Sequence, residues 1–76
     1  MVEPDVVART VEEISRKYQK CRKTRKMTQE EVSKEAGISR SSLARFESGK
    51  HNPTLEGLIK MADAMGYKFD IKLSKK

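Results

Sequence analysis

Two arginines and a pair of serines follow Gly37 in the middle of the chain, close enough together to share one short helix. Arg40 and Arg45 can each donate two parallel hydrogen bonds, a geometry that matches O6 and N7 of guanine. Ser41 and Ser42 can donate to or accept from a base edge or a phosphate. These side chains therefore predict recognition of base edges in the major groove of double-stranded DNA.

Polar residues on both sides of this stretch are suited to the DNA backbone. Thr28 and Gln29 begin the preceding predicted helix, where free backbone N–H groups and the helix dipole favour an anion such as a phosphate. Ser39 precedes the arginine-bearing helix, and residues 50–52 form a polar loop after it. The candidate DNA-binding residues are Thr28, Gln29, Ser39, Arg40, Ser41, Ser42, Arg45, Lys50, His51 and Asn52.

No group of residues in the sequence predicts catalysis. His51 is the only histidine, and no Cys, Asp or Glu lies at metal-ligand spacing from it. The serines have no histidine partner to act as a base, and there is no glycine-rich phosphate loop. Helix capping accounts for Glu30 and Glu31. We therefore expect a protein that is not an enzyme and that uses no metal or cofactor.

The charge of the chain points to an acidic partner. The 76 residues carry a net charge of +6, and the isoelectric point is near 9.7. Nucleic acid is the commonest partner of such a domain, with anionic lipid and acidic protein as alternatives. We interpret the basic run of residues 16–26 as a solvated or diffusely attractive face, whose effect would appear mainly in the salt dependence of binding.

The composition predicts a cytoplasmic, helix-rich globule. The single cysteine, Cys21, excludes an intramolecular disulfide and falls on an apolar helical stripe, so we interpret it as a small buried residue. No apolar stretch is long enough for a signal peptide or a membrane span, so no membrane partner is expected. Charged residues make up 37% of the chain, but the apolar residues recur at helical spacing, which argues against disorder.

Two longer helices are expected to frame the site. The first runs from about Pro4 to Lys26, and its inward-facing apolar residues are Val7, Val11, Ile14, Tyr18 and Cys21. The last begins at Pro53-Thr54 and ends before Gly66, with an apolar face of Leu55, Leu58, Ile59, Ala62 and Met65.

Two short helices are expected between them. Thr28 and Glu31 form a capping box flanked by the apolar pair Met27 and Val32, and Gly37 ends this helix. In the next helix, Ser39 is the cap, and Gly49 provides the stop. Its residues Leu43 and Phe46 should face Val32 and Ala36, which leaves Arg40, Ser41, Ala44 and Arg45 directed away from the core.

The residues after Gly66 alternate between apolar and charged, which predicts a β-strand over 67–73. A lone strand leaves its backbone groups without partners, so we expect the same strand of a second copy to pair with it. The predicted dimer interface is Lys68, Phe69, Asp70, Ile71, Lys72 and Leu73. The expected fold is all-α: a compact four- to five-helix bundle with a helix-turn-helix and this short C-terminal strand, in one domain of residues 1–76 with its core at 6–66.

Residues 22–66 resemble the Xre family of phage Cro- and cI-type repressors, which implies a λ-repressor-like fold. The resemblance lies in the run from Met27 to Gly49, followed by Asn52-Pro53-Thr54-Leu55 and by Met61-Ala62-Asp63-Ala64-Met65-Gly66. It implies that Gln29, Arg40, Ser41 and Arg45 contact DNA. It also implies a structural ion pair between Arg22 of the first helix and Glu47 at the end of the third.

The tail differs from the phage repressors, which continue with another helix, and is similar to HigA- and HipB-type antitoxins of toxin–antitoxin operons. This resemblance implies a dimeric repressor of its own promoter that also binds a cognate toxin protein.

Three functions are compatible with these patterns. The first is a transcriptional repressor that binds a palindromic operator as a homodimer. The second is a protein-interaction module that mainly neutralises a toxin, with DNA binding secondary. The third is a nonspecific binder of nucleic acid or membrane surfaces, driven by charge alone.

Overall fold

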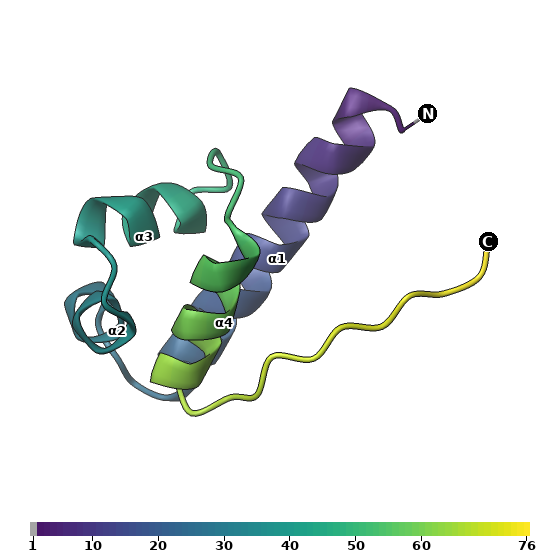
Figure 1. Cartoon of the computed structure of the whole chain (residues 1–76). Coiled ribbons are helices and arrows are strands. Elements are labelled where there is room, and N and C mark those ends of the chain that lie inside the picture. The colour runs from purple at the N-terminus through teal and green to yellow at the C-terminus, as the bar shows by residue number, and fades with distance from the viewer. Residues whose placement is uncertain (1) are drawn as a thin grey trace.

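The computed structural model describes residues 2–76, which form four α-helices and an extended tail (Figure 1). The helices are α1 (Pro4–Thr24), α2 (Gln29–Ala36), α3 (Arg40–Glu47) and α4 (Leu55–Ala64). α2 packs against both α3 and α4, and α3 also packs against α1. The all-helical class and the four helices predicted from the sequence are therefore confirmed.

Side-chain caps begin the three shorter helices. The hydroxyls of Thr28, Ser39 and Thr54 each accept a hydrogen bond from a backbone N–H three residues further along the chain. Gly37 ends α2 in the left-handed conformation, with φ of 70°. The predicted caps and the glycine stop are confirmed, and the turn between α2 and α3 is as short as expected.

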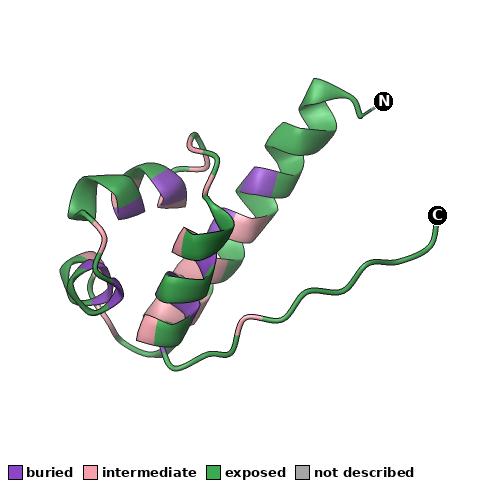
Figure 2. Cartoon of the chain, in the orientation of Figure 1, coloured by how far each residue is buried: buried purple, intermediate pink, exposed green. Residues whose placement is uncertain are grey.

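The core lies where the four helices meet (Figure 2). Leu43 and Phe46 of α3 are buried together with Val32 and Ala36 of α2, as predicted. Tyr18 of α1 completes this contact, since its ring meets that of Phe46 edge to face at 5.4 Å. α4 adds Leu58, Met61 and, just beyond its end, Met65 to the same cluster.

A tyrosine hydroxyl joins α1 to α4. Tyr18 donates a hydrogen bond of 2.9 Å to the backbone carbonyl of Leu58. Burial, with a smaller contribution from the neighbouring Cys21, raises the pKa of Tyr18 to about 12. Cys21 itself is half-buried and packs against the core, in agreement with its predicted apolar role.

The two ends of α1 differ from the prediction. Val7 was expected to face inward, but it is 45% exposed because the first turns of α1 extend past the helices that could cover them (Figures 1 and 2). At the other end α1 stops at Thr24, and Lys26 adopts a positive φ of 56° in the turn to α2. A lysine gives no sequence signal for that conformation.

The predicted strand over residues 67–73 is wrong for the single chain. The described residues contain no strand, and the tail runs extended away from α4 (Figure 1). A strand requires a neighbouring strand to receive its backbone hydrogen bonds, and residues 2–76 of one copy supply none. Phe69 alone in this segment packs against the core.

None of the described helices combines the length and apolar character needed to cross a membrane.

Candidate nucleic-acid interface

α3 presents a polar face opposite its buried face. Leu43 and Phe46 are each 2% exposed, whereas Arg40, Ser41 and Arg45 are all exposed. Burial of the two apolar side chains fixes the rotation of the helix, so the two arginines and the serine lie in solvent. The structure thus places these three predicted contact residues together on one accessible surface.

Ser39 and Ser42 form two hydrogen bonds with each other at the start of α3. Ser39 accepts a hydrogen bond of 3.1 Å from the backbone N–H of Ser42. It also donates one of 2.8 Å to the Ser42 hydroxyl, whose own proton remains available to a ligand. Ala44 is half-buried rather than directed fully into solvent. The accessible face of α3 is therefore narrower than the sequence suggested.

The capping box of α2 shapes a second group of donors. Thr28 accepts from the N–H of Glu31, and its own N–H donates to the Glu31 carboxylate at 2.9 Å. Among the described residues, the backbone N–H groups of Gln29 and Glu30 have no hydrogen-bond acceptor. These two donors at the positive end of the helix dipole can bind a phosphate.

An ion pair fixes α1, α2 and α3 to one another. Arg22 donates to both carboxylate oxygens of Glu47, at 2.7 and 2.9 Å, and also to the carbonyl of Met27 at 2.9 Å. The side chains of Arg22 and Glu47 are only 13% and 4% exposed. The hydrogen bond from the guanidinium to Glu47 raises the pKa of Arg22 further above its ordinary value.

Gln29 belongs to the same network. Its side-chain amide donates a hydrogen bond of 3.0 Å to Glu47, a contact that sequence reasoning missed because it depends on how α2 and α3 meet. The half-buried Gln29 is thereby held between the start of α2 and the end of α3.

The loop after α3 lies beside α1. Lys50 and Asn52 are exposed and His51 is half-buried. Gly49, which precedes them, has φ of 79°, and a Cβ built there would lie 3.2 Å from Cγ of Glu12. Within residues 2–76, no cluster of three or more His, Cys, Asp or Glu side chains could hold a metal ion.

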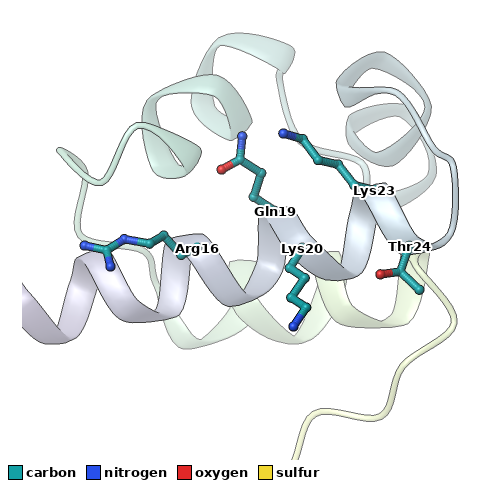
Figure 3. Close-up of a pocket in the computed structure, with 5 residues that line it drawn as sticks. All are labelled: Arg16, Gln19, Lys20, Lys23 and Thr24. Carbon is teal, nitrogen blue, oxygen red and sulfur yellow. The ribbon is translucent and has the colours of Figure 1, made fainter.

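A further polar surface lies on α1 (Figure 3). The hollow there is lined by Arg16, Gln19, Lys20, Lys23 and Thr24. The sequence pattern predicted one diffuse basic face over residues 16–26. Helical spacing alone would have placed Arg16, Gln19, Lys20 and Lys23 on one face of α1.

The comparisons with known proteins agree with this geometry. Residues 19–72 match the model of a family described as helix-turn-helix. The chain is 43% identical over 49 residues, 64% of its length, to a cryptic phage CTXphi transcriptional repressor from Vibrio cholerae. It is 38% identical over 53 residues, 70% of its length, to an immunity repressor protein of Bacillus phage phi105.

The matched stretches cover 44% and 37% of those two repressors. An HTH-type transcriptional regulator from Sinorhizobium fredii is 37% identical over 49 residues, which make up 64% of each chain. No solved structure matches the chain.

Proposed function

Because this chain belongs to the Xre-type helix-turn-helix family, we propose that it is a transcriptional repressor that binds one DNA operator sequence as a homodimer. The observation that carries the proposal is the exposure of Arg40, Ser41 and Arg45 on α3, on the side opposite the buried Leu43 and Phe46. An α-helix fits the major groove, and the two guanidiniums suit guanine there.

Residues outside α3 would hold the DNA backbone. Thr28, Gln29 and the free N–H groups at the start of α2 would bind a phosphate. Lys50, His51 and Asn52, on the loop after α3 and beside α1, would add further backbone contacts. Ser39 and Ser42 add hydroxyls at the start of the recognition helix.

The distribution of exposed apolar residues supports the dimer. Every large hydrophobic side chain found exposed in residues 2–76 lies outside α2 and α3, on the N-terminal turns, α4 or the tail: Val2, Val6, Val7, Leu55, Ile59, Tyr67, Ile71 and Leu73. We propose that the tail pairs with its copy through Lys68, Phe69, Asp70, Ile71, Lys72 and Leu73. Pairing would give its backbone groups partners and would set two recognition helices about 34 Å apart over a palindrome.

A second candidate function is neutralisation of a toxin protein, with this chain as the antitoxin. It is favoured by a groove of about 570 Å³ between α1, α4 and the tail, whose lining includes Ile14, Leu55 and Ile71. An apolar groove next to an extended segment suits a protein partner. Purification of the tagged chain from its native host tests this function, because an antitoxin should retain one stable toxin partner.

Selection of bound oligonucleotides from a random pool tests the repressor proposal. We expect one palindromic sequence to be enriched. Arg40→Ala or Arg45→Ala should each lose about 1–3 kcal/mol of discrimination between that sequence and random DNA. Lys34→Ala, at an exposed position of α2, is the matched control and should keep the discrimination. Equal discrimination in the parent and both arginine variants would contradict the proposal.

A further inference from the structure

We propose that Arg16, Gln19 and Lys23 of α1 form an additional binding site for a backbone phosphate of DNA, beside the recognition helix. The inference rests on the proposed DNA-binding function and extends its footprint onto α1. The three residues are called the α1 clamp below.

The α1 clamp lies on the flank of α1 that faces α3. Glu12 and Ser15, on the same side of the helix, approach Gly49 just after α3. Gln19 and Lys23 follow Ser15 at spacings of four and eight residues, so they continue along this side. In Figure 3 they point toward α2 and α3, whereas Lys20 and Thr24 point away from them.

The hollow is suited to an anion. The hollow has a volume of about 450 Å³. Its lining contains three cationic side chains and two neutral polar ones, and no carboxylate or aromatic ring. A phosphate needs only hydrogen-bond donors and positive charge, whereas an unpaired base would need a ring to stack on. The lining therefore fits the sugar–phosphate backbone better than it fits a base.

The donors of the clamp are available. Among the described residues, the amide of Gln19 and the ammonium of Lys23 form no hydrogen bond or ion pair within the protein. Arg16 pairs with Glu12 at 3.1 Å, but the two side chains are 72% and 51% exposed. An exposed pair of this kind contributes little, so a phosphate can displace Glu12.

The clamp is continuous with the other proposed backbone contacts. Arg22, adjacent to Lys23 in α1, bonds to Glu47 at the end of α3, and Glu47 accepts from Gln29 at the start of α2. A DNA strand bound at the start of α2 therefore has the α1 clamp next to it. One DNA duplex can contact both the start of α2 and the α1 clamp, which favours DNA over an acidic protein as the occupant.

The test compares two charge-matched double variants. Arg16→Gln with Lys23→Gln removes two cations from the clamp. The control, Lys34→Gln with Lys60→Gln, removes two exposed cations from α2 and α4. Lys60 matches Arg16, because it also forms an i,i+4 ion pair, with Glu56 at 2.9 Å. Affinity for duplex DNA is measured from low to high salt, and thermal unfolding checks that each variant folds.

The clamp variant should bind DNA with a shallower salt dependence. The slope of log affinity against log salt should fall by about 0.9 per protomer, because the variant no longer neutralises the one phosphate bound by the clamp, while the control stays near the parent. Glu12→Gln should have the opposite effect on affinity, because it frees Arg16 and removes a negative charge. Preference for the selected sequence over random DNA should not change, because phosphate contacts carry no sequence information.

Equal slopes for the clamp variant and the control would overturn the inference. An acidic protein would then be the better candidate to occupy the hollow. The slope comparison does not depend on sequence specificity. If selection enriched no sequence, the repressor proposal would fail, and the slopes on random duplex would still decide whether the clamp binds phosphate.

Discussion

The carboxylate of Glu47 joins three helices around the proposed interface. It accepts hydrogen bonds from Arg22 of α1 and from Gln29 of α2, while it belongs to α3 itself. With 4% of its side chain exposed, the carboxylate depends on these partners to compensate for the hydration that burial removes. The orientation of α3 is therefore coupled to this carboxylate.

Replacing Glu47 should destabilise the fold much more than replacing the whole pair. Glu47→Leu leaves Arg22 charged and nearly buried without its anion, which should cost about 3–5 kcal/mol in the free energy of unfolding. The double variant Arg22→Met with Glu47→Leu removes both charges and should recover most of that stability. Urea unfolding at neutral pH measures both. A double variant as unstable as the single one would show that packing, not the unpaired charge, sets the cost.

At the level of helices, the turn between α2 and α3 sets the angle of the recognition helix. Gly37 holds φ of 70° there, and a Cβ added to it would meet nothing within 4 Å. The left-handed backbone, not crowding, is therefore what requires glycine at this position.

Gly37→Ala should cost about 1–2 kcal/mol of stability, because the only penalty is that of a left-handed residue with a Cβ. Gly37→Asn is the control, and it should cost less, since asparagine tolerates this conformation. Thermal and urea unfolding of the two variants check the order. An alanine variant as stable as the parent would mean that the turn adopts another conformation.

The helices and caps could be predicted from the sequence because their signals are local. Thr28 with Glu31, and Ser39 before its helix, need only neighbouring residues to act. The apolar stripe of α1 identified its inward face but could not show that Val7 stays 45% exposed.

The remaining features depend on how distant segments meet. The hydrogen bond from Gln29 to Glu47 exists only once α2 and α3 are packed. The alternation in residues 67–73 indicates extended backbone but cannot name the partner that a strand requires. The exposure of Arg40, Ser41 and Arg45 could be predicted, because helical spacing alone places them on the face of α3 opposite Leu43 and Phe46.

At the scale of the whole molecule, polar and apolar surfaces are separated. The proposed DNA contacts lie on α2, α3, the loop after α3 and the α1 clamp, while the exposed apolar side chains gather on the N-terminal turns of α1, on α4 and on the tail. One copy of the proposed recognition helix reads only half of a palindrome. When two copies are joined, binding of the first gives the second recognition helix an effective concentration in the millimolar range at its own half of the palindrome. The operator affinity should therefore depend on the tail.

Ile71 and Leu73 provide the sharpest test of the dimer. They are 69% and 95% exposed in the single chain, so replacing both with glutamate should leave its fold intact. In the proposed dimer the same change places charges in the seam between copies, which costs free energy because buried charges lose hydration. We expect the parent to sediment as a dimer at micromolar concentration and the double variant as a monomer with weaker operator binding. Ala8→Glu, at an exposed position of α1 outside this set of large apolar side chains, should remain dimeric. A parent that sediments only as a monomer would remove the basis for pairing through the tail.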